Sequence, residues 1–256
     1  MSRIEGFEPE RDLLPWCKGA IFDLDGVIVD TARYHYLAWR RLAEELGFEF
    51  TPEHNERLKG VSRMRSLEIL LEVGGISVSP EEKQQLAEKK NHWYVEYISA
   101  LTPDALLPGA REFLTWLRER GVKIALGSAS KNAPLILDRL GITGLFDAVV
   151  DGTMVEKAKP DPEVFLKGAG LMDVDPRECV VFEDAVAGIE AARRGGMKAV
   201  GVGDPEVLAE ADWVVRSLAE CLPTGGASEG SSEEKKLDSS PEGVYNSDTK
   251  CNVKPF

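Results

Sequence analysis

Short apolar runs rich in β-favouring residues alternate along the chain with longer stretches of helical periodicity. Strands are predicted at 19–23, 122–127, 147–151, 179–183, 198–202 and 212–215. Helices are predicted at 109–120, 132–140, 161–171 and 185–195. Strands that alternate with helices indicate βαβ units, and uninterrupted apolar strands are typical of a sheet covered on both faces. The pattern therefore predicts an α/β fold with a Rossmann-like, mostly parallel sheet.

The segment 33–106 breaks this alternation, because helical patterns follow one another there and no strand is evident. These patterns cover 34–47, 62–75 and 79–100. A wholly helical block inserted after the first strand of an α/β domain predicts a second, smaller domain. The core domain is then discontinuous, made of 19–32 and 107–222.

Two of these helices carry recognisable end signals. Ser79 is a predicted N-cap, with Pro80 at the first helical position and Glu82 at the third. Gly47 is the predicted residue just beyond the end of the first helix.

The two ends of the chain differ from the rest. Residues 1–18 form an N-terminal extension before the first strand. Residues 223–256 are rich in Gly, Ser, Glu and Lys, and such a segment buries too little apolar surface to offset its ordering entropy. We therefore expect 223–256 to be a disordered tail.

Composition narrows the class of partner. The 256 residues include 44 acidic and 31 basic side chains, which gives a net charge of −13. This balance argues against non-specific nucleic-acid binding and against an anionic membrane surface, although a few local cations can still bind a phosphate-bearing ligand. No apolar run approaches the ~20 residues of a membrane span. We expect a small-molecule substrate and a monomer or weak homo-oligomer.

The four cysteines, Cys17, Cys179, Cys221 and Cys251, are scattered and do not suggest a zinc site. The first fifteen residues lack the features of a signal or transit peptide. Reduced thiols in the cytoplasm are therefore expected.

Two carboxylates follow the first predicted strand directly. The strand at 19–23 ends in Asp23, and Asp25 and Gly26 come next. Ligands of doubly wound sheets bind beyond the carboxyl ends of the strands, and Gly26 allows a sharp turn there. Strand alternation predicts that the side chains of Asp23 and Asp25 lie on the same side.

A second acidic pair, Glu183 and Asp184, ends the strand at 179–183. If this strand neighbours the first, four carboxylates converge and raise one another's pKa values. A divalent cation relieves that repulsion, and oxygen ligands favour a hard ion, Mg²⁺.

Phosphate ligands are predicted at two further strand ends. Ser128 ends the strand at 122–127 and precedes a helix, whose N-terminal N–H groups attract phosphate oxygens. Lys159, followed by Pro160, supplies an ammonium that can neutralise a transferring phosphoryl group.

Four motifs now stand in order along the chain. They are D-L-D-G-V at 23–27, S-A-S at 128–130, K-P at 159–160 and E-D at 183–184. Each is weak alone, but together they resemble the motifs of the haloacid dehalogenase-like phosphotransferases over roughly residues 19–215. The resemblance implies that Asp23 is the nucleophile that becomes an aspartyl phosphate and that Asp25 is the general acid/base. A dehalogenase is not expected, since enzymes of that kind have no metal-binding aspartate at the position that Asp25 occupies here.

Within that superfamily the chain resembles the β-phosphoglucomutases. The matching stretches are D-T-A-R-Y-H at 30–35, Trp39, K-G-V-S-R at 59–63, A-L-G-S-A-S-K-N at 125–132 and E-D-A-V-A-G-I at 183–189. The resemblance implies that the helical block is a cap and that β-glucose 1-phosphate and glucose 6-phosphate interconvert through β-glucose 1,6-bisphosphate. A cap that closes over the sugar excludes water, which would otherwise hydrolyse the aspartyl phosphate.

The resemblance also implies the remaining site residues. Around the transferring phosphate it places Ser128, Ala129, Lys159 and Asn132. Around the sugar and its second phosphate it places Thr31, His35, Trp39, Gly60, Val61, Ser62, Arg63, Ser66, Lys90, Asn91, Ser130 and Lys131. The guanidinium of Arg63 is the expected ligand of the second phosphate, and His35 is linked to the state of Asp25.

Structural alternatives accompany these interpretations. Asp23 and Asp25 are also common turn residues, and Glu183–Asp184 is also a candidate helix cap. His35 and Trp39 also fit an apolar helix stripe, and Lys90 also fits a solvated face. At the level of function, the alternatives are a sugar-phosphate phosphatase on the same scaffold and a non-catalytic sugar-phosphate-binding protein.

Overall fold

The computed structural model describes residues 7–58 and 61–223. In this part of the chain, six parallel strands form one sheet in the order β3-β2-β1-β4-β5-β6. The strands are β1 (Gly19–Phe22), β2 (Lys123–Gly127), β3 (Ala148–Val150), β4 (Cys179–Glu183), β5 (Lys198–Val202) and β6 (Trp213–Val215). The predicted Rossmann-like α/β class is confirmed.

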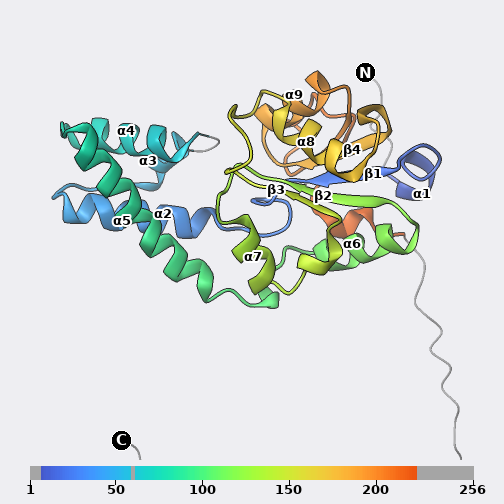
Figure 1. Ribbon diagram of the computed structural model, residues 1–256, viewed down its shortest axis with the longest axis horizontal. Helices are drawn as coiled ribbons and strands as arrows, with labels where there is room; N and C mark the ends of the chain where they lie inside the picture. The colour runs from blue at the N-terminus through green and yellow to red at the C-terminus, as the bar shows by residue number, and fades with distance from the viewer. Residues whose placement is uncertain (1–6, 59–60, 224–256) are drawn as a thin grey trace, which may run out of the picture. The chain divides into compact units, whose positions relative to one another are not determined.

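Helices cover both faces of the sheet (Figure 1). They are α6 (Ala110–Glu119), α7 (Ala133–Arg139), α8 (Glu163–Met172) and α9 (Val186–Arg194). Strand alternation sends Phe22 and Phe182 toward α6, where their rings stack at 4.6 Å and meet Phe113 edge-on. Ile21, the residue before Phe22, lies on the other face of the sheet and packs with Phe165 of α8. This double burial explains the uninterrupted apolar strands.

The helical block consists of α2 (Ala32–Glu45), α3 (Pro52–Glu56), α4 (Arg63–Gly74) and α5 (Pro80–Ser99). Ser79 and Glu82 form the predicted capping box at the start of α5, and Gly47 has a φ of 87° just beyond α2. The short α3 was not predicted, since its capping box pairs Thr51 with His54 instead of Glu or Gln. No helix in the described ranges has the length and apolarity that a membrane crossing requires.

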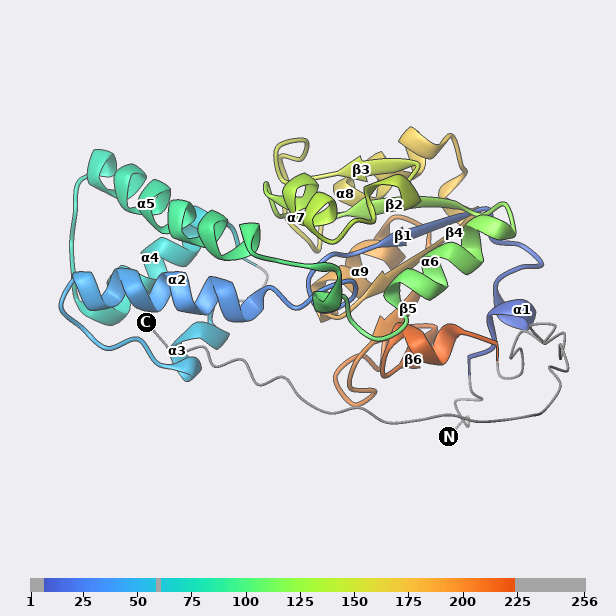
Figure 2. The same cartoon turned by 90° about the horizontal axis from the view of Figure 1, so that it is seen from below.

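The chain leaves the sheet for the helical block and returns from it at adjacent points. Val29 and Leu106 form an isolated antiparallel bridge, and Leu107 N donates to Ile28 O at 2.9 Å. Figure 2 shows the two connections running together between β1 and the helices. The proposed boundaries at 33 and 106 stay predictions.

Two predicted boundaries matter for the site. β1 ends at Phe22, so Asp23 and Asp25 both follow the strand, and strand alternation does not set the direction of their side chains. Similarly, β2 ends at Gly127 and α7 begins only at Ala133. Residues 128–132 therefore form a loop, and Ser128 does not lie at a helix N-terminus.

Part of the N-terminal extension packs against the core. The helix α1 (Pro9–Asp12) precedes buried Leu13 and Cys17, and the Phe7 ring lies 5.6 Å from the Trp213 ring of β6. Four short 3₁₀ helices complete the described chain: Pro103–Ala105, Thr143–Leu145, Pro176–Glu178 and Leu218–Cys221. The predicted tail at 223–256 lies outside the described residues, apart from Pro223.

Candidate active site

The carboxyl ends of β1 and β4 and the loop between β3 and α8 bring together two carboxylates and a lysine. β1 pairs with β4 in parallel, and Asp23 N donates to Phe182 O at 2.9 Å, which aligns Asp23 with Glu183. Lys159 Nζ lies 2.6 Å from Asp23 Oδ1 and 3.2 Å from Glu183 Oε2. The ammonium also lies 4.7 Å from the centre of the Phe165 ring. Asp23 and Glu183 are buried.

The electrostatics of this group follow from burial and proximity. Burial lowers the pKa of Lys159, but the Asp23 and Glu183 carboxylates outweigh it and hold that pKa above its usual value. Burial, and then the Asp23 charge, raises the pKa of Glu183 well above its usual value. The group therefore holds the protonated Lys159 beside Glu183, a carboxyl that resists ionisation.

Three carboxylates form a candidate metal site. One oxygen each from Asp23, Glu183 and Asp184 lies within 4.8 Å of the others. Such an all-oxygen, carboxylate donor set suits a hard divalent cation. Asp25 does not belong to this cluster, although four converging carboxylates were expected.

Two glycines allow the carboxylates to stand where they do. Gly26 has a φ of 76°, and a Cβ there would lie 2.1 Å from Asp184 Oδ2. A Cβ at Gly188, in the first turn of α9, would lie 2.0 Å from Glu183 Oε1. Glu183 and Asp184 do not cap this helix, since its N-cap is Ala185. Gly26 was predicted as a turn residue, whereas Gly188 had no predicted role.

Asp25 is held by Thr31 instead. Thr31 N donates to Asp25 Oδ1 at 3.3 Å, and the Thr31 hydroxyl bonds the same oxygen. The pKa of Asp25 is raised to about 7, mainly by burial. The hydrogen bond from the Thr31 hydroxyl lowers this pKa, and the nearby Asp23 charge raises it. A carboxyl with a pKa near neutrality suits both proton donation and acceptance.

The helical block contributes a second polar cluster around Lys90 of α5. Lys90 is buried, and its Nζ lies 2.7 Å from His35 Nδ1 and 4.5 Å from the centre of the Trp39 ring. Burial, and then the charges of Lys90 and Arg63, lowers the pKa of His35 well below its usual value. A neutral imidazole can accept a hydrogen bond from Lys90 in the tautomer that leaves Nδ1 unprotonated. Burial and the Arg63 charge likewise lower the pKa of Lys90 well below its usual value.

The other predicted residues of the helical block lie at the start of α4. Ser62 is the N-cap and its hydroxyl accepts from Arg65 N at 3.3 Å, while Ser66 is buried one turn later. Arg63 is half-buried, which lowers its pKa. Val61 is exposed, and the predicted Gly60 lies outside the described residues.

The loop 128–132 is organised by its own serines. The buried Ser128 hydroxyl accepts from Ser130 N at 3.1 Å, and Ser130 Oγ accepts from Asn132 N at 3.3 Å. Asn132 Nδ2 donates to Asn91 Oδ1 of α5 at 3.2 Å, which joins this loop to the helical block. The predicted Ala129 and Lys131 are exposed in the same loop.

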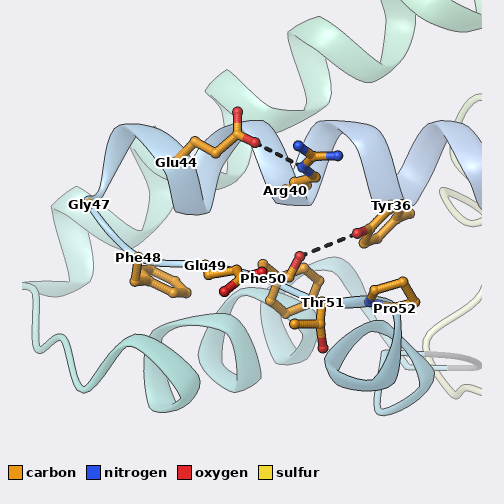
Figure 3. Close-up of a pocket in the computed structure, with 9 residues that line it drawn as sticks. All are labelled: Tyr36, Arg40, Glu44, Gly47, Phe48, Glu49, Phe50, Thr51 and Pro52. Carbon is orange, nitrogen blue, oxygen red and sulfur yellow. Dashed lines mark hydrogen bonds and ion pairs between the residues drawn. The ribbon is translucent and has the colours of Figure 1, made fainter.

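A separate cavity of about 500 Å³ lies within the helical block, between α2 and the chain that follows it. Figure 3 shows Tyr36, Arg40 and Glu44 on one side and the segment 47–52 on the other. Arg40 pairs with Glu44, and the Tyr36 hydroxyl donates to Phe50 O at 3.4 Å. None of the residues that line it belongs to the predicted site, so we place the candidate site at the strand ends.

One polar contact near Asp25 has no counterpart in the sequence predictions. Tyr94 is fully buried, its hydroxyl lies 3.1 Å from Thr31 Oγ1, and its ring stacks on His35 at 3.9 Å. Its position four residues after Lys90 was a signal that could have found it, because residues at i and i+4 share a helix face.

Residues 17–196 match the profile of the family described as a hydrolase of the haloacid dehalogenase-like type. The chain belongs to the haloacid dehalogenase-like hydrolase family.

Within this family, the chain is 49% identical over 205 residues to the β-phosphoglucomutase of Bacillus subtilis (strain 168), covering 79% of this chain and 91% of that protein. The crystal structure of β-phosphoglucomutase from Clostridium difficile superposes with a TM-score of 0.76 at 46% identity, covering 80% of this chain and 92% of that one. A phosphorylated carbohydrates phosphatase of Thermotoga maritima is 33% identical over 205 residues, covering 77% of this chain and 92% of that protein. These relatives confirm the predicted family and favour the mutase interpretation over the phosphatase alternative.

Proposed function

We propose that this protein is a β-phosphoglucomutase. It interconverts β-D-glucose 1-phosphate and glucose 6-phosphate through a phosphorylated Asp23 and β-glucose 1,6-bisphosphate. The observation that carries the proposal is the contact of Lys159 with Asp23 and Glu183 at adjoining strand ends, in a chain 49% identical to a β-phosphoglucomutase.

Asp23 is the proposed nucleophile. Its carboxylate attacks the phosphorus of a donor sugar phosphate, the phosphorus–oxygen bond of the sugar breaks, and Asp25 gives a proton to the departing oxygen. In the second half, a hydroxyl of the sugar phosphate attacks the phosphorus of phospho-Asp23, the bond between phosphorus and the Asp23 oxygen breaks, and Asp25 takes the hydroxyl proton. A pKa of about 7 lets Asp25 serve in both directions near neutral pH.

Lys159 is the proposed counter-charge for the transferring phosphoryl group. Its ammonium is already directed at Asp23 by Glu183 and by the Phe165 ring, so little reorganisation is needed as charge develops. The residues Ser128, Ala129 and Asn132, in the loop that follows the adjacent strand β2, are proposed to supply further hydrogen-bond donors.

The proposed cofactor is Mg²⁺. The residues that would hold it are Asp23, Glu183 and Asp184, and the predicted fourth ligand, Asp25, lies two residues after Asp23. Because Gly26 and Gly188 have no Cβ, the oxygens of Asp184 and Glu183 have room. When bound, the ion would neutralise repulsion among the carboxylates and stabilise the charge of the phosphoryl oxygens.

The helical block is the proposed cap that separates a mutase from a phosphatase. In a mutase, a sugar hydroxyl and not water must attack the aspartyl phosphate. Binding of the acceptor's own phosphate therefore has to contribute to closing the site and excluding water. Arg63, half-buried at the start of α4, is the proposed ligand of that phosphate. The other proposed substrate contacts are Thr31, His35, Trp39, Gly60, Val61, Ser62, Ser66, Lys90, Asn91, Ser130 and Lys131.

The domain boundaries, a monomeric or weakly oligomeric state and a cytoplasmic location stay predictions. Absence of a role in nucleic-acid or membrane binding is likewise a prediction from net charge.

Product analysis tests the proposal. Purified protein receives β-glucose 1-phosphate, Mg²⁺ and a trace of glucose 1,6-bisphosphate, and glucose 6-phosphate and inorganic phosphate are measured in parallel. We expect glucose 6-phosphate to exceed phosphate by at least about tenfold, with α-glucose 1-phosphate as the comparison substrate. Phosphate as the main product would establish the phosphatase, and tight ligand binding without turnover would establish the non-catalytic alternative. Asp23→Asn is the inactive control for contaminating enzymes.

A further inference from the structure

Tyr94 of α5 contacts both Thr31, which bonds the proposed acid/base Asp25, and His35, a proposed substrate contact. Its side chain is fully buried. Its hydroxyl bonds Thr31 Oγ1, and its ring stacks on His35 with an interplanar angle of 22°. We propose that Tyr94 is a positioning residue that fixes the Thr31 hydroxyl toward Asp25 and thereby orients the acid/base of the proposed mutase.

The direction of the hydrogen bonds carries the argument. A threonine hydroxyl has one proton and rotates freely unless its surroundings fix it. The Tyr94 hydroxyl donates to Thr31 Oγ1 at 3.1 Å, and this leaves the single Thr31 proton for Asp25 Oδ1. Thr31 N bonds the same carboxylate oxygen, so Asp25 is held by two donors from one residue. Without Tyr94, the hydroxyl proton of Thr31 loses the partner that sets its rotation.

The position of Tyr94 on α5 joins this chain of bonds to the sugar side of the proposed site. Tyr94 follows Lys90 by four residues and Asn91 by three, so all three share one helix face. Lys90 Nζ lies 4.8 Å from the centre of the Tyr94 ring and bonds His35, the ring on which Tyr94 stacks. Asn91 accepts from Asn132 of the 128–132 loop. The helix α5 therefore carries both Tyr94, which bonds Thr31, and the proposed substrate contacts Lys90 and Asn91.

Burial explains why a tyrosine suits this position better than a phenylalanine. A buried phenol without a partner loses its hydration at a net cost, so its hydroxyl has to be bonded. Thr31 is equally buried, and its hydroxyl has the Asp25 carboxylate and the Tyr94 phenol as its partners. The ring alone would fill the same volume, so the hydroxyl is the part that acts on Thr31.

A double-mutant cycle on the full chain tests this inference, which rests on the proposed function. Tyr94→Phe keeps the ring on His35 and removes only the hydroxyl. We expect kcat to fall about tenfold, the scale of one neutral hydrogen bond, while KM for β-glucose 1-phosphate stays within about twofold. Because Tyr94 acts through Thr31, Tyr94→Phe in a Thr31→Val background should change kcat by less than about twofold.

The matched control is Tyr36→Phe, which removes another phenol of the helical block whose hydroxyl bonds the Phe50 carbonyl, away from the strand ends (Figure 3). This variant should keep kcat within about twofold of the wild type. Independent, multiplying effects of Tyr94→Phe and Thr31→Val would overturn the inference, as would a Tyr94→Phe enzyme with wild-type kcat. If the wild type releases phosphate instead of forming glucose 6-phosphate, the same cycle is run on phosphate release, since Asp25 serves the leaving oxygen in both reactions. Failure of the proposed function is then distinguished from failure of the positioning role.

Discussion

Gly188 lies directly against the Glu183 carboxylate, and a Cβ added to Gly188 would stand 2.0 Å from Glu183 Oε1. The contact lets the first turn of α9 pass the end of β4 while Glu183 still faces Lys159. Glycine inside a helix costs about 1 kcal/mol relative to alanine. Gly188 therefore lowers the stability of α9, but it leaves the space that the Glu183 carboxylate occupies.

Gly188→Ala should therefore displace Glu183 and lower kcat/KM by more than about tenfold, with a loss of about 1–3 kcal/mol of stability from overpacking. Gly170→Ala in α8 is the matched control, because a Cβ there meets nothing within 4 Å and should stabilise by about 0.4–1 kcal/mol. Steady-state kinetics and urea unfolding measure both. Wild-type kinetics in Gly188→Ala would contradict the role given to this contact.

Replacing Lys159 by Met should leave two buried carboxylates without their cation. Removing one partner of a buried ion pair costs about 3–5 kcal/mol, and loss of the counter-charge should lower kcat by at least about 10²-fold. Lys167→Met removes an exposed lysine paired with Glu163 and should leave stability nearly unchanged. Chemical unfolding and kinetics of both variants check this.

The pH dependence of Lys159→Met should have a definite sign. Since the pKa of Glu183 is raised in the fold, the folded state binds more protons than the unfolded state above pH 4.5, the usual pKa of a glutamate. The variant should therefore become more stable as the pH falls from 8 to 5. In the wild type, the raised pKa of Lys159 means that its contribution is complete below pH 10.5 and is lost only as the pH rises through the folded value. Variant stability that is flat or falls toward pH 5 would refute this account.

Thr31→Val should move the ionisation of Asp25 to higher pH. The Thr31 hydroxyl bond favours the ionised carboxylate and lowers a pKa that burial has raised to about 7. Without that bond the pKa rises, and the limb of the kcat/KM profile that reports Asp25 should shift upward by a measurable fraction of a unit. Thr115→Val on α6 is the control, expected to leave the profile in place. A downward shift would show that Thr31 does not stabilise the carboxylate.

Removal of divalent cations should abolish turnover without unfolding the protein. Chelation leaves the three clustered carboxylates to repel one another, while the apolar core is untouched. Adding Mg²⁺ at about 100 times its dissociation constant should stabilise the wild type by about 2.7 kcal/mol. Asp184→Asn should lose most of this gain, and Glu206→Gln, which removes an exposed acid elsewhere, should keep it. Equal Mg²⁺ stabilisation of Asp184→Asn and the wild type would argue against the cluster as the metal site.

The linear sequence determined the fold class and the two strand ends that carry Asp23 and Glu183, whereas Lys159 lies in the loop between β3 and α8. Apolar runs flanked by helical periodicity specify a covered parallel sheet, because hydrophobic burial depends on local pattern. The capping box at Ser79 was likewise readable, since a cap is an interaction between residues three positions apart.

The tertiary structure alone decided which carboxylates share one cluster and which one is set apart. Asp25 accepts hydrogen bonds from Thr31 and lies outside the cluster of Asp23, Glu183 and Asp184, and both facts depend on how separate segments pack. The roles of Gly188 and Tyr94 were equally hidden, since each depends on an atom from another element passing within a few ångströms. Periodicity reports which face of an element is buried, but the partner that meets that face is chosen only when distant segments pack together.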